Sequence, residues 1–181
     1  MRVVTEALNG VFLLEPNIFH DSRGLFFESW NKTVFENLNI PFHFVQDNQS
    51  LSSKNVIRGL HFQKAPFEQG KLVRVVKGSV VDVAVDIRPG SRTFMQHFKA
   101  ELSENNFRMM WIPPGFAHGF VALENNTVFL YKCTGYYNKN AESGIIYNDP
   151  DLNIDWGKED AIVSEKDLSL PFLKEINFNI S

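Results

Sequence analysis

The chain has 181 residues, of which 44% are hydrophobic and 22% charged, a balance typical of one globular domain with a sizeable core. A formal net charge of −3 argues against a general affinity for nucleic acid, whose phosphates attract basic surfaces. The single cysteine, Cys133, excludes an internal disulfide, and no apolar run is long enough for a signal peptide or a membrane span, so we expect a cytoplasmic protein without membrane partners.

The first 50 residues are predicted to hold a hairpin, a turn followed by a strand, and one helix. Residues 1–16 have the pattern of two strands around Asn-Gly at 9–10, a strong hairpin signal. Residues 21–24 have the composition of a turn. A helix is expected over residues 31–39, because an asparagine can cap it and apolar residues recur at helical spacing.

The segment after the second turn combines aromatic rings with a carboxylate. On a strand, Phe26, Glu28 and Trp30 would share one face. One interpretation is a ligand-binding face, on which the rings stack against a flat group while Arg23 or Glu28 hydrogen-bonds it. The other is a half-exposed edge strand, and the residues alone leave both open.

Short strands separated by turns dominate the chain up to residue 134. They are expected at residues 42–50, 55–63, 71–78, 79–87, 93–102, 108–112, 116–123 and 127–134. The polar stretch 46–50 is either a loop or a ligand-facing strand end. In the strand at 79–87, alternation separates four apolar residues from Asp82 and Asp86. Many short strands with one helix predict a sandwich, jelly roll or barrel.

The strand at residues 55–63 carries the first candidate site residues. Strict alternation would point Arg58 and His61 to opposite faces. A bulge at Gly59 would add one residue and bring both side chains to the same face. The pair would then provide a fixed positive charge beside a group that titrates near neutral pH. The alternative is a surface arginine and a hydrogen-bonded core histidine.

The other histidines and the missing motifs reduce the number of reactions that the chain could catalyse. A metal is not expected, because His118 could join His61 as a ligand but no third ligand is evident, and His20, His43 and His97 stand in contexts typical of loops or solvent-facing positions. No Gly-x-Ser-x-Gly turn and no Gly-rich phosphate loop occurs, so neither a serine nucleophile nor a nucleotide cofactor is indicated. The remaining His, Lys, Tyr, Arg and Asp side chains suit abstraction of a proton next to a carbonyl.

Nine short motifs follow one another, over nearly the whole chain, in the order found in one known family. They are Asp21-Ser-Arg-Gly with Phe26 and Glu28, Gln46-Asp-Asn, Arg58-Gly-Leu-His-Phe-Gln63, Gln69-Gly-Lys-Leu-Val73, Asp82-Val-Ala-Val-Asp-Ile-Arg88, Pro113-Pro-Gly-Phe-Ala-His-Gly-Phe120, Tyr131-Lys, Tyr136-Tyr137 and Ser164-Glu-Lys-Asp167. Each is weak alone, but together they are specific. The chain resembles the dTDP-4-dehydrorhamnose 3,5-epimerase family of cupin-fold sugar-nucleotide enzymes.

The resemblance implies a mainly β fold, a cupin-type jelly roll (double-stranded β-helix) with few short helices. It implies one domain over residues 1–181 and a homodimer whose N-terminal strands cross to the partner, so that Arg23, Phe26 and Glu28 serve the neighbouring site. It also implies a reaction without cofactor: dTDP-4-dehydro-6-deoxy-D-glucose is epimerised at C3 and C5 to dTDP-4-dehydro-L-rhamnose, through an enolate reprotonated from the opposite face.

The resemblance also implies roles for single residues. His61 is the expected base and Asp167 the acid partner that orients it. Lys71 would stabilise the enolate oxygen, and Tyr131 would return a proton. Without the resemblance, Asp167 would be interpreted as part of a helix capping box that begins at Ser164. The expected substrate-binding residues are Phe19, Arg23, Phe26, Glu28, Gln46, Asp47, Asn48, Arg58, His118, Glu142 and Lys166.

Three alternatives are weighed against this interpretation. An epimerase that inverts only C3 or only C5 of a related 4-keto sugar nucleotide would need the same base at His61. A cupin that binds sugar nucleotides without reaction is disfavoured, because it needs no base opposite an acid. A metal-dependent cupin would need a stoichiometric divalent ion, with activity lost on chelation.

Overall fold

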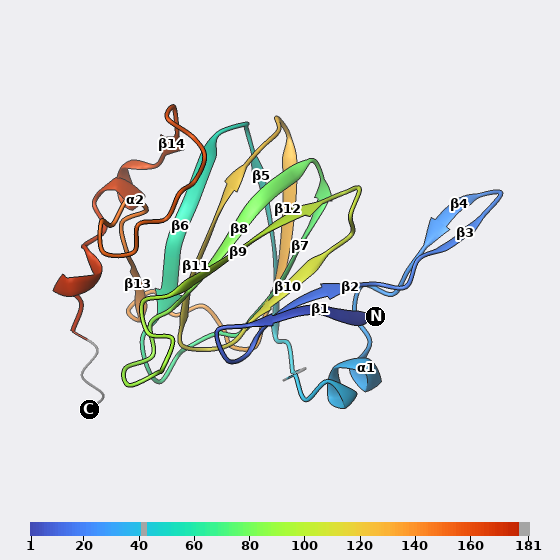
Figure 1. The fold of residues 1–181 in the computed structure, drawn as a ribbon, viewed down its shortest axis with the longest axis horizontal. Coiled ribbons are helices and arrows are strands. Elements are labelled where there is room, and N and C mark those ends of the chain that lie inside the picture. The colour runs from blue at the N-terminus through green and yellow to red at the C-terminus, as the bar shows by residue number, and fades with distance from the viewer. Residues whose placement is uncertain (41–42, 178–181) are drawn as a thin grey trace.

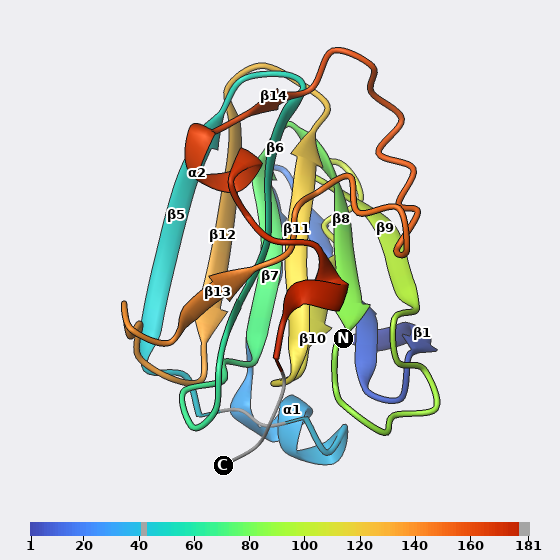
Figure 2. The same ribbon diagram turned by 90° about the vertical axis from the view of Figure 1, so that its left-hand side faces the viewer.

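The computed structural model describes residues 1–40 and 43–177 and consists mainly of two antiparallel sheets that face each other (Figures 1 and 2). The strands of the first sheet are, in order, β1 (Arg2–Ala7), β2 (Val11–Glu15), β10 (Met109–Ile112), β7 (Lys71–Lys77), β12 (Thr127–Cys133) and β5 (Gln46–Ser52). Those of the second are β13 (Glu142–Gly144), β6 (Val56–Gln63), β11 (Phe116–Ala122), β8 (Ser79–Asp86) and β9 (His97–Ser103). The predicted mainly β, cupin-type jelly roll is confirmed.

The remaining elements are short, and except for β14 they lie outside this pair of sheets. A hairpin of β3 (Phe19–Asp21) and β4 (Gly24–Phe26) projects away from the body (Figure 1). Strand β14 (Ile162–Val163) pairs in parallel with β6. The helices are α1 (Lys32–Asn37), α2 (Glu165–Leu168) and the 3₁₀ turn η1 (Leu173–Glu175). Within the described ranges no helix is long and apolar enough to cross a membrane.

The space between the sheets is filled by an interior cluster of apolar side chains. Its buried members are Val11, Leu13, Val73, Val75, Val80, Ala84, Leu102, Met110, Ile112, Phe116, Phe120 and Phe129. They come from both sheets because alternate residues of each strand point inward. Phe129 of β12 stacks on Phe120 of β11 with ring centroids 4.3 Å apart, and this contact joins the two sheets.

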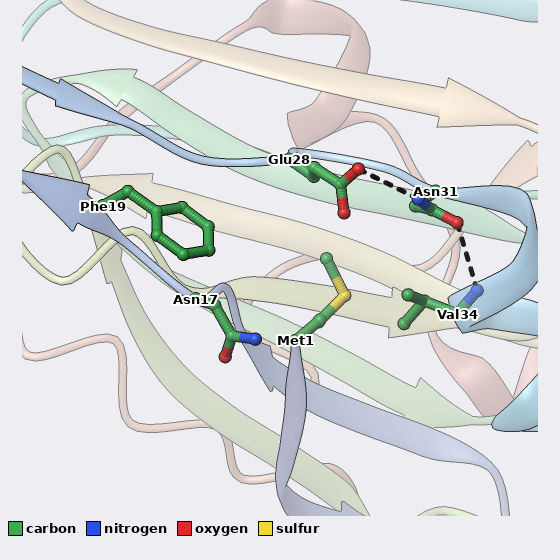
Figure 3. Close-up of a pocket in the computed structure, with 6 residues that line it drawn as sticks. All are labelled: Met1, Asn17, Phe19, Glu28, Asn31 and Val34. Atoms are coloured by element: carbon green, nitrogen blue, oxygen red, sulfur yellow. Dashed lines mark hydrogen bonds between the residues drawn. The ribbon is translucent and has the colours of Figure 1, made fainter.

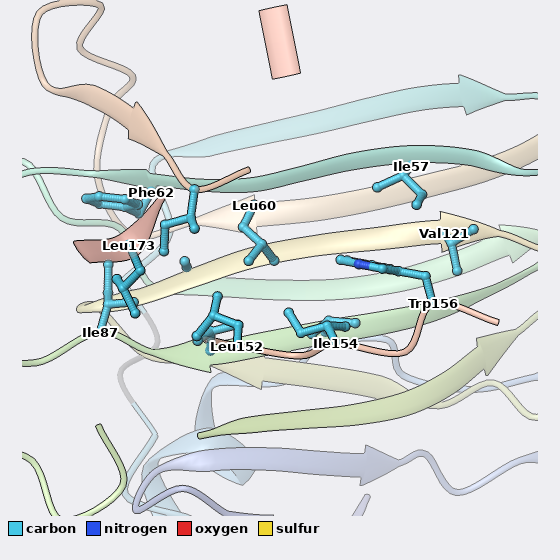
Figure 4. Packing of buried hydrophobic residues seen from close by; sticks show 13 residues of the cluster. Ile57, Leu60, Phe62, Ile87, Val121, Leu152, Ile154, Trp156 and Leu173 are labelled. Atoms are coloured by element: carbon cyan, nitrogen blue, oxygen red, sulfur yellow. The ribbon is translucent and has the colours of Figure 1, made fainter. Parts of the chain in front are cut away.

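The outer face of the second sheet is covered by the segment that follows β13 (Figure 4). This outer cluster consists of Ile57, Leu60, Phe62, Val83, Val85, Ile87, Ala117, Val121, Ile145, Leu152, Ile154, Trp156 and Leu173. The buried Asp149 carboxylate fixes the covering segment by accepting the backbone N–H groups of Leu152 and Leu173. Strand β8 is therefore buried on both faces, which accounts for its apolar sequence.

The outer face of the first sheet is only partly covered. Phe35 of α1 is fully buried against Leu72 and Trp111, and the N-cap Asn31 accepts the N–H of Val34, as the sequence predicted. Farther along the same face, beside β12 and β5, an open hollow of about 220 Å³ is lined by residues that include Arg74. The helix thus protects one part of this face and leaves another open.

The predicted bulge in β6 is present. In the register with β11, His118 lies opposite His61 and Phe120 opposite Arg58, so β6 uses one residue more than β11 between these pairs. Gly59 occupies the bulge with φ +122°, a conformation that L side chains rarely adopt. The extra residue gives Arg58 and His61 the same orientation, toward the interior.

Three predicted strands differ from the structure. The prediction that Phe26, Glu28 and Trp30 share a strand face is wrong, because β4 ends at Phe26 and the chain turns toward α1. Glu28 Oε1 instead accepts a hydrogen bond of 3.0 Å from Asn31, the residue that caps the helix. Local capping thus prevails over the strand pattern.

The strand expected at 93–102 begins only at His97. The hydroxyls of Ser91 and Thr93 donate to the buried carboxylate of Asp86, and these bonds hold residues 91–96 in turns. Of the strand expected at 42–50, the polar stretch 46–50 is part of β5, but residues 43–45 belong to no strand, and residue 42 lies outside the described residues.

Candidate active site

A histidine–aspartate pair lies where β6 meets α2. His61 Nε2 and Asp167 Oδ1 are 2.8 Å apart, and Asp167 Oδ2 accepts the N–H of Gly59 at 3.2 Å. The Asp167 side chain is 6% exposed and the imidazole 36%. Because an ionised carboxylate can only accept, Nε2 carries the proton of the neutral ring and Nδ1 is left as the basic nitrogen.

The short helix α2 positions Asp167 for this contact. Ser164 caps the helix by accepting the N–H of Asp167 at 3.1 Å, so the predicted cap exists, but the Asp167 carboxylate points to His61. Burial alone would raise the pKa of Asp167. The hydrogen bond and charge of His61, with the N–H of Gly59, outweigh burial and hold this pKa below its ordinary value. Asp167 is therefore ionised at neutral pH.

A second histidine–aspartate pair is buried deeper. His118 lies opposite His61 in the β6–β11 register, and its Nε2 is 3.0 and 3.2 Å from the two carboxylate oxygens of Asp82 on β8. The imidazole ring stacks near Phe129 with a centroid distance of 6.0 Å. Burial lowers the pKa of His118, and the charge of Asp82 opposes the shift only in part. The ring is therefore neutral at pH 7.

The first sheet contributes an amine and a phenol. Lys71 begins β7, and Tyr131 lies on β12 two residues before Cys133, which pairs with Lys71 across the strands. Burial lowers the pKa of Lys71 and raises that of Tyr131. The charge of Lys71 lowers the pKa of His118, and so would a positive charge on His61, so both side chains lie near the His118 ring. The interior thus brings together the four predicted catalytic residues, His61 and Asp167 from one side and Lys71 and Tyr131 from the other.

A polar wall of β5 adjoins Arg58. The guanidinium donates to Ser52 Oγ and to the carbonyl of Leu51, both at 3.1 Å. Gln46 and Asn48 share the inward face with Ser52, and the Gln46 amide donates to Asn48 Oδ1 at 2.9 Å. A fixed cation and several amide groups therefore line one side of the interior.

Asp47 stands apart from its predicted partners. Alternation along β5 points it outward, where it forms a salt bridge of 2.9 Å with Lys132. The structure therefore separates Asp47 from Gln46 and Asn48, although the three are consecutive.

A charged cluster lies beside the dyad. Lys166 donates to Glu142 Oε1 at 2.6 Å, and the hydroxyl of Tyr137 donates to Glu142 Oε2 at 3.0 Å. The bond from Lys166 keeps the pKa of Glu142 below its ordinary value. Strand β13 sets Gly144 opposite His61, so Glu142 lies two residues along from the dyad. These two predicted substrate-binding residues are close to His61 but are bonded to each other.

The N-terminal candidates lie outside the interior of their own chain. Phe19 and Phe26 are 62% and 66% exposed on the projecting hairpin, and Arg23 pairs with Asp21 beside its turn. A pocket of about 330 Å³ at the base of the hairpin is lined by Met1, Asn17, Phe19, Glu28, Asn31 and Val34 (Figure 3). Nothing in this pocket belongs to the histidine–aspartate dyad.

Asp82 is the residue of the interior that the sequence analysis placed on a strand but assigned no role. A signal was available, because a carboxylate inside a strand that is apolar on both faces needs a specific partner. Among residues 1–40 and 43–177, no three His, Cys, Asp or Glu side chains are grouped so that they could hold a metal ion.

The dyad, the buried amine and the phenol line the interior of a jelly roll, and together they define a cupin-type enzyme of the acid–base class. The profile of a family described as dTDP-4-dehydrorhamnose 3,5-epimerase matches residues 5–175. The chain belongs to this family, whose members are isomerases.

Individual relatives agree with the family profile. A dTDP-4-dehydrorhamnose 3,5-epimerase of Pseudomonas aeruginosa is 51% identical over 169 residues, which cover 92% of this chain and 93% of the relative. The crystal structure of an epimerase from Legionella pneumophila, in complex with dTDP-4-keto-L-rhamnose, matches with a TM-score of 0.93 and 46% identity over 97% of this chain and 94% of that chain. A 3'-monoepimerase from Streptomyces bikiniensis, in complex with dTDP-quinovose, is less similar, with a TM-score of 0.85 and 28% identity over 91% and 84%.

Proposed function

We propose that this enzyme epimerises dTDP-4-dehydro-6-deoxy-D-glucose at C3 and C5 to dTDP-4-dehydro-L-rhamnose without a cofactor. The observation that carries the proposal is the placement of a base and an acid on opposite sides of one interior. His61 belongs to the second sheet and Tyr131 to the first. A sugar ring between them would lose a proton to one face and gain one from the other, which inverts the carbon.

The proton steps follow from the proposed roles. His61 Nδ1 takes the proton from a carbon next to the 4-keto group, and Asp167 stabilises the imidazolium that forms. The electron pair moves to the keto oxygen, and the Lys71 ammonium stabilises the resulting enolate. Tyr131 then donates its hydroxyl proton to the opposite face of the carbon, and its raised pKa suits a group that is protonated before this step. Solvent removes the proton from His61 and returns one to Tyr131.

The remaining candidates would hold the nucleotide and the sugar. Arg58 suits the diphosphate, because a guanidinium fork matches paired phosphate oxygens. Gln46 and Asn48 line the wall beside it, while Glu142 and Lys166 lie by the dyad and would exchange their mutual bond for contacts with the ligand. Asp47 completes the proposed set, and it would exchange its outward salt bridge with Lys132 for a contact with the ligand.

The reaction is tested by proton NMR of the purified protein with this substrate in D₂O. Deuterium at both C3 and C5 supports the double epimerase. Deuterium at only one of the two carbons would identify the protein as a single-site epimerase instead. His61→Asn should stop exchange at both carbons while dTDP binding stays near that of the parent, because Nδ1 is lost but Arg58 is untouched. Exchange at the parent rate in this variant contradicts the assignment of the base.

The proposed assembly is a homodimer of single-domain subunits in which the β3–β4 hairpin reaches the partner's site. Support comes from the hairpin, which projects from the body and exposes Phe19, Leu25 and Phe26. Arg23 pairs with Asp21 and Glu28 with Asn31, both on the N-terminal segment of their own chain, and the resemblance to the family implies that Arg23 and Glu28 bind the nucleotide. The hairpin would then complete the nucleotide site of the second copy.

Complementation between two inactive variants tests this exchange. His61→Asn keeps a normal hairpin, and Arg23→Ala with Phe26→Ala keeps a normal base. If the hairpin serves the partner, co-expressed mixtures should regain up to about a quarter of the parent activity, since half the dimers are mixed and each has one complete site. No recovery in isolated mixed dimers assigns the hairpin to its own subunit.

The cytoplasm is the proposed compartment. Cys133 is a buried free thiol, which suits a reducing environment, and the proposed substrate is a nucleotide sugar. Nucleic acid is not a proposed partner, given the formal charge of −3.

A further inference from the structure

We propose that Asp82 is a positioning residue of the reaction centre: its buried carboxylate holds His118 in the tautomer protonated at Nε2 and supplies a negative charge to the interior that Lys71 shares. The inference rests on the proposed function and gives His118 a narrower part in it. A neutral His118 whose Nε2–H is bonded to Asp82 presents Nδ1 as an acceptor only. It can accept a hydrogen bond from a sugar hydroxyl, whereas stabilising the enolate oxygen is left to Lys71.

The contacts of Asp82 are unusual for a buried carboxylate. The residue is fully buried, and both of its oxygens lie within 3.2 Å of a single atom, His118 Nε2. In the described part of the chain it accepts no other hydrogen bond. Burial of an ionised carboxylate costs several kcal/mol unless charges or hydrogen bonds compensate. One imidazole N–H compensates only in part, so a nearby cation is expected, and the charge that interacts with Asp82 is Lys71.

Asp86 provides the comparison on the same strand and the same face. It is also fully buried, but it accepts hydrogen bonds from Arg88, Ser91 and Thr93 and forms a salt bridge with Arg88. Its carboxylate is satisfied by its own turn and has no contact with the candidate site. Two aspartates four residues apart are thus buried in different ways, and Asp82 is the one that faces functional side chains.

The other groups around Lys71 do not replace this charge. Cys133 faces it from β12, and burial raises the pKa of that thiol, so it is neutral at pH 7. His118 faces it from β11 and is neutral as well. His61 acts on His118 from β6, and its own carboxylate partner is Asp167. Asp82 is therefore the anion that opposes the effect of burial on Lys71.

A pH dependence follows from this arrangement. Cys133 and, after it, Asp82 raise the pKa of Lys71 against the lowering by burial, and of these two groups only the carboxylate is charged at pH 7. Without the carboxylate, Lys71 loses its proton at a lower pH, and an enzyme that needs the ammonium loses activity at a lower pH. The basic limb of the rate profile of Asp82→Asn should therefore move to lower pH. An asparagine can also turn its amide to donate to Nε2, which would move the ring proton to Nδ1.

The experiment measures deuterium incorporation into the substrate across a pH series for the parent, Asp82→Asn and the control Asp86→Asn. We expect Asp82→Asn to be about 10–100-fold slower at pH 7, by analogy with the loss on removing the carboxylate partner of a metal-ligating histidine. We expect the basic limb of its rate–pH profile to lie at lower pH than that of the parent, and its dTDP binding to stay close to that of the parent. Asp86→Asn should lower the melting temperature without moving the limb. An unmoved limb in Asp82→Asn overturns the proposal.

A second measurement covers the case in which Asp82→Asn does not fold. Long-range ¹H–¹⁵N spectra of the ¹⁵N-histidine-labelled parent distinguish the two tautomers, and His118→Asn assigns the resonance. The proton of His118 on Nε2 at pH 7 supports the proposal, and its presence on Nδ1 overturns it. This spectrum does not depend on turnover, so a parent enzyme without exchange would contradict the proposed reaction and leave the tautomer result standing.

Discussion

Substitution of Asp167 by asparagine should slow catalysis far more than it disturbs binding. In the parent, one carboxylate oxygen lies 2.8 Å from His61 Nε2 and the other accepts the N–H of Gly59 at 3.2 Å. An asparagine has a single acceptor oxygen for these two donors. If the amide keeps its bond from Gly59, its NH₂ group points to Nε2 and forces the ring proton onto Nδ1, where the base is needed.

The magnitude follows from the two possible orientations of the amide. Turning the oxygen to Nε2–H restores the active tautomer but leaves the Gly59 N–H opposite a donor, at a cost of about 1–3 kcal/mol. The imidazolium formed in the reaction also loses its charged partner, and such a hydrogen bond contributes about 1.5–3 kcal/mol. The sum of about 2.5–6 kcal/mol corresponds to a rate lower by about 10²–10⁴-fold.

The assay is deuterium incorporation at C3 and C5 under substrate saturation, with dTDP binding measured by calorimetry. Glu165→Gln is the matched control, since it removes an exposed carboxylate from the same helix without reaching His61. It should react at nearly the parent rate. A rate for Asp167→Asn within about threefold of the parent would refute the assignment of Nδ1 as the base and of Asp167 as its partner.

Three further changes test the framework of the site. Asp86→Asn should lose on the order of 2 kcal/mol of stability at pH 7, because Arg88 and its turn hold the Asp86 pKa at about 2 against 3.8; denaturant titrations should show the difference fading as the pH falls from 4 through 2. Gly59→Ala should lower the free energy of unfolding by about 1–3 kcal/mol through backbone strain alone. The loss should be larger because the added Cβ would lie 2.6 Å from Gly119 Cα, and an unchanged melting temperature would contradict this. Phe129→Ala should cost about 3–5 kcal/mol by opening a cavity in the interior cluster, measured by chemical unfolding, and a loss under 1 kcal/mol would show that the two sheets close over the gap.

The bulge in β6 could be predicted because its signals are local. A glycine stands between two functional residues whose side chains need one face, and the register of β6 with β11 confirms the shift. The β1–β2 hairpin and the Asn31 cap could be predicted for the same reason, because their signals lie in adjacent residues of the sequence. Strand alternation also predicts that Asp47 faces away from Gln46. The resemblance led to the opposite expectation, because it treated Gln46, Asp47 and Asn48 as one ligand-binding motif.

The contact between His61 and Asp167 could not be predicted from local pattern. The two residues are 106 positions apart, and Ser164 with Asp167 forms a cap that explains the local sequence without any role in the site. Only the covering segment after β13, which packs on the outer cluster, brings α2 to β6. The second dyad was missed for a related reason, since Asp82 meets His118 through the pairing of β8 with β11.

The separation of His61 and Asp167 by 106 residues has a consequence for the order in which the site forms during translation. The long strands of both sheets have all been translated by residue 133, before the helix that contains Asp167. The polar wall of β5 with Arg58 thus precedes Asp167 in the order of synthesis, and His61 is translated 106 residues before its carboxylate partner. The proposed base therefore obtains its carboxylate partner only when the segment after β13 has been translated and packs over the outside of the second sheet.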